Sequence, residues 1–195
     1  MGSFFTDSLH ALFRPTALVA TSRNGRHPFR GIAAALLLGT AYAALYGWLS
    51  ANGHRPSMTR GLPISADAYY GAAALYSAPL VLALMFSVVL TVHGLARTAA
   101  KPPIHWHQAL HVFGMSYAIP LLTIYLIPDL VTYGAFDFAA LAAIIRYTGP
   151  LAALWVATVT YKSVRTLYGT SRGRALASTL TAALAQAIPA AVLLR

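Results

Sequence analysis

The chain has 195 residues, of which 58% are hydrophobic and only 9% are charged, whereas soluble domains carry roughly 25% charged residues. A soluble domain of this size cannot bury so much apolar surface, so the composition predicts a membrane protein and excludes a soluble enzyme or a disordered tail. The chain has no Cys, which excludes disulfides and thiolate sites. Its formal net charge is +10.

Residues 1–30 are predicted to form a cytoplasmic amphipathic segment. Phe5, Leu9, Leu12 and Phe13 recur at near-helical spacing in it. Such a helix either lies on the membrane surface or packs against the rest of the protein. The segment lacks the continuous apolar core of a secretory signal, so we expect the chain to insert through its own first spanning helix.

Five later stretches are apolar and about 20 residues long, the length that crosses a bilayer. We therefore predict an all-α integral membrane protein whose transmembrane domain, residues 31–195, contains five helices. Their expected positions are about 31–50, 70–95, 108–127, 139–161 and 175–194.

Basic residues are distributed unevenly between the two sides of this predicted topology. Ten fall on the side of the N-terminus, namely Arg14, Arg23, Arg26, Arg30, Arg97, Lys101, Lys162, Arg165, Arg172 and Arg174. The other side has Arg55, Arg60 and Arg195. Because cytoplasmic loops are enriched in Lys and Arg, we expect the N-terminus in the cytoplasm and the C-terminus outside. Lipid headgroups explain the positive charge, and no motif points to nucleic acid.

Small residues form stripes at four-residue spacing in two predicted spans. The stripe in the first span consists of Gly31, Ala35, Gly39, Ala43 and Gly47, and the stripe in the fourth consists of Gly149, Ala153 and Ala157. Such stripes let helix backbones approach closely. The neighbour is either another helix of the same chain or a second copy.

Prolines interrupt the predicted spans at positions 79, 120, 150 and 189. Each removes one backbone donor and crowds the carbonyl four residues earlier. The resulting kinks either shape packing or open a cavity between helices, as in transporters.

Histidines His93, His107 and His111 are candidate metal ligands, since His107 and His111 lie four residues apart on one helix face. The alternative is that these rings anchor the protein at the membrane interface. No Glu is available to complete a metal site, and the fourth and fifth spans contain no His for axial haem ligation. We therefore expect no metal and no cofactor.

A second polar group contains Arg146, Asp129, Asp137 and Gln186. An Arg inside a span is costly and often marks an ion pathway, but it can also reach the interface and pair with a loop Asp such as Asp137. Gln186 can hydrogen-bond a carbonyl freed by Pro189. No pair of carboxylates or activated nucleophile is evident, so we expect no enzymatic activity.

Three segments resemble the Yip family of Ypt/Rab-interacting membrane proteins. The entry to the first span, residues 12–16, is similar to the family's amphipathic entry, and residues 104–120 are similar to its short loop and third helix. Residues 161–167 are similar to its exit into the last cytoplasmic loop. The family's Gly-Gly turn is replaced by residues 99–103, and the long tail of eukaryotic members is missing, so Rab binding is not implied. The resemblance implies a bacterial-type member in the inner membrane.

Two functions are compatible with these features. The first is a non-enzymatic protein that organises the membrane or binds other membrane proteins or a second copy of itself. The alternative is a small transporter or channel component with a cavity between kinked helices, lined by Arg146, Asp137 and Gln186. A histidine-based metal protein is the weakest interpretation.

Overall fold

The structure is a computed structural model that describes residues 3–23, 29–56, 64–100, 103–136 and 138–193. All regular elements of these residues are helical. In chain order they are α1 (Phe4–Phe13), α2 (Pro15–Arg23), α3 (Arg30–Ala51), α4 (Ala66–Ala96), η1 (Arg97–Ala99), α5 (Trp106–Pro120), η2 (Leu121–Leu126), α6 (Ile127–Ala135), α7 (Phe138–Tyr168) and α8 (Arg172–Leu193).

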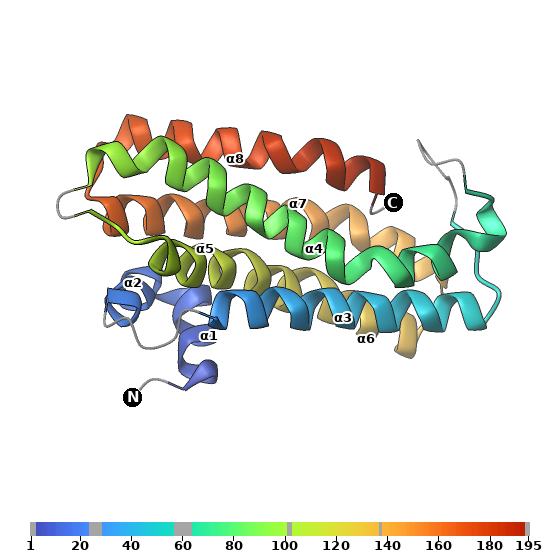
Figure 1. Cartoon of the computed structure of the whole chain (residues 1–195). Helices are drawn as coiled ribbons and strands as arrows, with labels where there is room; N and C mark the ends of the chain where they lie inside the picture. The colour runs from blue at the N-terminus through green and yellow to red at the C-terminus, as the bar shows by residue number, and fades with distance from the viewer. Residues whose placement is uncertain (1–2, 24–28, 57–63, 101–102, 137, 194–195) are drawn as a thin grey trace.

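The long helices run back and forth along one direction, as Figure 1 shows. One end of the bundle holds the start of α3, the end of α4, the start of α5 and the turn from α7 to α8. The two short helices α1 and α2 lie at this same end, and α1 crosses the direction of α3. The N-terminal segment and the two basic connections therefore share one end of the molecule, as the predicted topology requires.

Three helices are long and apolar enough to cross a membrane: Arg30–Ala51, Ala66–Ala96 and Trp106–Ala135. They coincide with the first three predicted spans. The predicted span at 139–161 falls within α7, and the span at 175–194 lies in α8 up to Leu193, where the described residues end. The predicted helical class is confirmed, and the three apolar helices are those expected of a membrane protein.

The third apolar helix is longer than predicted because it continues through a wide π-type turn, η2. Pro120 precedes this turn and Pro128 follows it, and neither residue can donate a backbone hydrogen bond. The Thr123 hydroxyl donates to the carbonyl oxygens of Ile119 and Pro120, at 2.9 and 3.3 Å. The chain stays helical to Ala135, although the prediction ended this span near residue 127.

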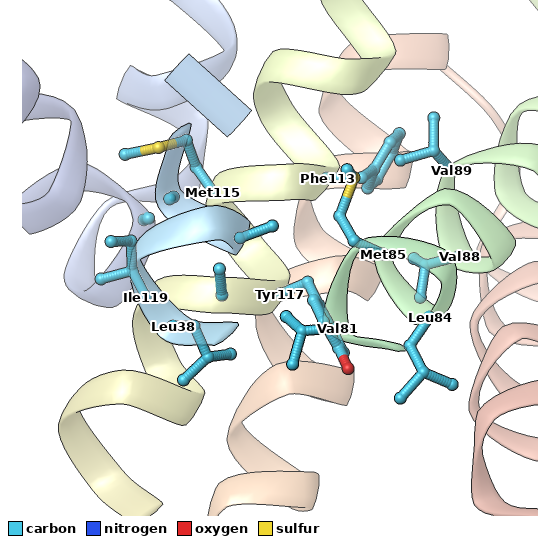
Figure 2. Close-up of a cluster of buried hydrophobic side chains, with 14 of the residues drawn as sticks. Leu38, Val81, Leu84, Met85, Val88, Val89, Phe113, Met115, Tyr117 and Ile119 are labelled. Atoms are coloured by element: carbon cyan, nitrogen blue, oxygen red, sulfur yellow. The ribbon is translucent and has the colours of Figure 1, made fainter. Parts of the chain in front are cut away.

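The apolar core lies between α3, α4 and α5. Figure 2 shows Leu38 of α3, Met85 and Val89 of α4, and Phe113 and Met115 of α5 gathered in one cluster. Met85, Val89, Phe113 and Met115 are all fully buried. A side chain that is removed from both water and lipid in this way contributes mainly through close packing.

Part of the stripe in α3 lets this helix approach its neighbours closely. A Cβ atom added to Gly31 would lie 2.1 Å from the carbonyl oxygen of Leu110 in α5, and one added to Gly39 would lie 2.6 Å from Cα of Ala78 in α4. A Cβ at Gly47 would meet no atom within 4 Å. The first half of the stripe therefore packs within the chain, whereas the position of Gly47 does not require a glycine.

Candidate functional site

A buried polar cluster joins α1 to the start of α3 and to α5. Asp7 of α1 places Oδ2 2.5 Å from Nη1 of Arg30 and 3.1 Å from Nε2 of His111. The side chains of Asp7 and His111 are 0% and 3% exposed, and that of Arg30 is 15% exposed. We call these three residues the N-terminal clamp.

The clamp explains why a charged residue can lie inside an apolar protein. An ionised carboxylate is expensive to bury unless it is paired and hydrogen-bonded. Arg30 supplies the opposite charge, and the imidazole of His111 supplies a second partner for the same oxygen of Asp7. The other oxygen, Oδ1, is buried and has no hydrogen-bond partner among the described residues. The cluster thus fixes the position of α1 while leaving one acceptor unused.

Helix α1 has apolar side chains on both sides: Phe4 and Leu12 pack against the core, and a second row points outward. Asp7 and Ala11 are buried against the bundle. Phe5, Leu9 and Phe13, which follow one another at four-residue spacing, are 71%, 42% and 67% exposed. We call these three side chains the outer ridge. A helix that faces water has charged and polar residues on its outer side, so a row of exposed apolar side chains is typical of a helix that faces lipid.

Two further hydrogen bonds tie the N-terminal helices to α7. The indole nitrogen Nε1 of Trp155 donates to the carbonyl oxygen of Leu12 at 3.2 Å. Nη2 of Arg23, at the end of α2, donates to the carbonyl oxygen of Thr166 at 3.3 Å. The N-terminal helices are therefore attached to three helices of the bundle, α3, α5 and α7.

The structure places the three candidate metal ligands in different surroundings. His111 belongs to the clamp, and the ring of His107 stacks on that of His105 with centroids 5.4 Å apart. His93 forms a 2.8 Å hydrogen bond between its Nδ1 and the hydroxyl of Tyr168, whose pKa is raised by burial. Within the described residues, no three His, Cys, Asp or Glu side chains gather in a way that could hold a metal ion.

The second predicted polar group is spread over different parts of the molecule. Arg146 is exposed on α7, and Asp129 is only 3% exposed in α6. Asp137 lies outside the described residues. Gln186 of α8 donates from Nε2 to the carbonyl oxygen of Leu84 in α4 at 3.1 Å, so it links two helices. In the described part of the chain no ion pair joins Arg146 to an Asp.

A partly open cavity of about 310 Å³ lies between the helices and is lined by residues of α3, α4, α5, η2, α7 and α8. The lining is largely apolar, and its polar residues are Tyr42, Tyr117, Tyr125, Thr160, Thr179 and Gln186. Arg146 is not among the lining residues. Of the members of the predicted polar group that the structure describes, Gln186 alone lines the cavity.

Sequence reasoning identified neither the role of Asp7 nor that of Arg30. The available signal was a single acid in the middle of the apolar helix 4–13, where an unpaired charge would be costly. The partner could not be read from spacing, because Asp7 and His111 are 104 residues apart in the chain.

The fold and the lengths of its three apolar helices define a helical bundle of the membrane-protein class. The chain matches no model of a known protein family, no curated protein and no solved structure.

Proposed function

We propose that this chain is a non-enzymatic protein that spans the membrane five times and organises the lipid around it, with its N-terminus in the cytoplasm. The observation that carries this proposal is the outer ridge, Phe5, Leu9 and Phe13, on a helix that crosses the end of the bundle. The resemblance to the Yip family supports the same kind of protein in a bacterial inner membrane.

The outer ridge is suited to shallow insertion into one leaflet. An interfacial helix buries its apolar side about 5–10 Å into the boundary between headgroups and acyl chains. Arg14, which follows α1 directly, and Arg23 at the end of α2 are exposed at the same end of the bundle. Their charges favour anionic headgroups. The clamp fixes α1 to the bundle. The side chains of the outer ridge that insert into the lipid therefore expand the cytoplasmic leaflet beside the bundle.

The alternative function, a small transporter or channel component, draws on the cavity. Gln186 lines it, but its other lining is largely apolar and Arg146 is not part of it. A path for ions or polar solutes needs polar groups along its length. The geometry therefore supports the membrane-organising role better than the transport role.

Replacing Phe5 and Phe13 together with Ser is expected to weaken the effect of the protein on membrane shape. Each Phe contributes about 1.5–3 kcal/mol when it is fully buried in an apolar environment, and serine contributes none of this. The full chain is reconstituted in vesicles of defined anionic lipid content, and vesicle diameter is measured by electron cryomicroscopy. Wild-type protein should produce smaller or tubular vesicles, and the double variant should lose most of this effect.

Phe136→Ser is the matched control, because Phe136 is 77% exposed and directly follows α6, which ends towards the other end of the bundle. It should reshape vesicles as the wild type does. Vesicles of equal diameter with wild-type protein and the double variant would contradict the proposal. If the double variant reshaped vesicles normally but no longer bound another membrane protein, the role of the outer ridge would be partner binding.

A further inference from the structure

A second, partly open pocket of about 380 Å³ lies at the end of the bundle that contains α1 and α2. A volume of this size is within the range of ligand sites. The residues that matter for its chemistry are Arg23 at the end of α2, Pro103 and Ile104 before α5, His105 and Gln108 at the start of α5, and Tyr168 at the end of α7. We call this site the Arg23 pocket. It is formed by three segments that are far apart in the chain.

The polar side chains of the Arg23 pocket are mainly hydrogen-bond donors. Arg23 donates from Nη2 to the carbonyl oxygen of Thr166 at 3.3 Å, but a guanidinium group has five N–H donors and so retains capacity for a ligand. Oε1 of Gln108 accepts a 3.0 Å hydrogen bond from the backbone N–H of His105, which leaves the amide nitrogen of Gln108 to donate. The imidazole of His105 carries an N–H group in either tautomer. These groups suit a ligand that accepts hydrogen bonds.

The charge around the Arg23 pocket is positive. Arg23 forms no ion pair among the described residues, and no acid is among the described residues that line the pocket. Of the acids that the structure describes, Asp7 is the one at this end of the bundle, and its side chain is 0% exposed in the N-terminal clamp. Further exposed cations at the same end are Arg14, Arg97, Arg165, Arg172 and Arg174. The pocket therefore favours an anion and repels an ammonium group.

In the proposed orientation the Arg23 pocket lies near the level of the lipid headgroups. Trp106, the first residue of α5, is 37% exposed, and tryptophan is enriched at membrane interfaces. Its ring contacts that of His93, with centroids 5.5 Å apart, and Nδ1 of His93 forms a 2.8 Å hydrogen bond with the hydroxyl of Tyr168. These contacts connect the interfacial ring to the inner wall of the pocket. Pro103 and Ile104 add apolar surface to the lining, which suits a lipid better than inorganic phosphate.

We propose that the Arg23 pocket binds the headgroup of an anionic phospholipid that lacks an ammonium group, such as phosphatidylglycerol. The guanidinium of Arg23 binds two phosphate oxygens, because its planar fork matches the geometry of phosphate. His105 and Gln108 donate hydrogen bonds to the other acceptors of the headgroup. This proposal deepens the proposed function by naming the lipid at the end of the bundle that contains α1, and it rests on the sidedness proposed there.

Native mass spectrometry of the full chain in detergent micelles tests this site. Phosphatidylglycerol or phosphatidylethanolamine is added in increasing amounts, and the apparent dissociation constant of each lipid is measured. The wild type should bind phosphatidylglycerol more tightly. Arg23→Gln should weaken this binding about tenfold, because it removes the charged partner of the phosphate, while glutamine can still donate to Thr166. His105→Phe keeps a ring beside His107 but removes the N–H group, so it should weaken binding about fivefold.

Arg14→Gln is the matched control, because Arg14 is an exposed cation at the same end of the bundle that does not line the pocket. The variant loses the same charge, yet its affinity for phosphatidylglycerol should stay within about twofold of the wild type, since solvent screens exposed charges. An equal loss of affinity in Arg14→Gln and Arg23→Gln would overturn the proposal, because general charge attraction would then explain the binding. Equal affinities of the wild type for the two lipids would overturn it as well.

Two further measurements separate the lipid from a soluble phosphate and the pocket from the outer ridge. Glycerophosphoglycerol, the same headgroup without acyl chains, should displace phosphatidylglycerol poorly, and full displacement at equal concentration would contradict a lipid ligand. The double variant Phe5→Ser and Phe13→Ser should bind phosphatidylglycerol as the wild type does, because neither residue lines the pocket. Loss of binding in this variant would contradict the assignment to the Arg23 pocket. Lipid binding and vesicle shape are measured independently, so the two proposals can fail separately.

Discussion

Replacing Asp7 with Ala is expected to release α1 from the bundle. The substitution removes the carboxylate that pairs with the mostly buried Arg30 and that bonds Nε2 of His111. Breaking a buried ion pair by removing one member costs about 3–5 kcal/mol. Because α1 is a ten-residue helix at one end of the molecule, we expect the loss to be largely local. Hydrogen exchange of α1 amides should become much faster, while exchange in α4 and α5 should change little.

Asp67→Ala provides the control for this substitution. Asp67 also pairs with an arginine, Arg55, but both side chains are more than two-thirds exposed. Exposed ion pairs contribute little, so exchange should stay close to that of the wild type throughout the chain. If α1 exchanged equally slowly in Asp7→Ala and in the wild type, the clamp would not be what holds this helix.

The second large effect is expected at the crossing of α3 and α5. Replacing Gly31 with Ala adds a Cβ atom 2.1 Å from the carbonyl oxygen of Leu110, and the Cα of Gly114 lies 3.1 Å from the same point. Both contacts are with backbone, which cannot rotate away as a side chain can. Overpacking of this kind costs about 1–3 kcal/mol or more. The variant should unfold at a clearly lower temperature in detergent.

Gly47→Ala is the corresponding control within the same stripe. Its Cβ would meet no atom within 4 Å, and alanine favours a helix over glycine by about 0.5–1 kcal/mol. The melting temperature should therefore stay the same or rise slightly. Equal melting temperatures for Gly31→Ala and Gly47→Ala would show that the two helices do not cross as closely as described.

The helices could be predicted from sequence because the length of each apolar stretch and the positions of the prolines are local signals. The first three predicted spans agree with the three apolar helices, and the basic connections share one end of the bundle. The extension beyond residue 127 was not predicted, because Pro128 is a local signal for the end of a helix, whereas the backbone continues through η2 and α6.

The site was predicted less well because it depends on partners that are distant in the chain. His111 was assigned by its spacing from His107, yet its bond is to Asp7 on another helix. The stripes of α3 and α7 have the same spacing, and only their surroundings distinguish close packing at Gly31 from the cavity at Gly149. Spacing identifies which residues share a face, but it does not show what lies opposite that face.

The sidedness of the bundle can be measured directly, because the chain has no cysteine and single cysteines can be introduced cleanly. Thr98 lies in η1 after α4, and Ser171 lies between α7 and α8, so Thr98→Cys and Ser171→Cys probe the end of the bundle that contains α1. Asn52 follows α3 and Phe136 follows α6, so Asn52→Cys and Phe136→Cys probe the opposite end. All four positions are exposed. A membrane-impermeant maleimide should label positions 52 and 136 in intact cells and positions 98 and 171 only in inside-out vesicles. Labelling of all four positions from one side would contradict a membrane-spanning bundle with α1 on the cytoplasmic surface.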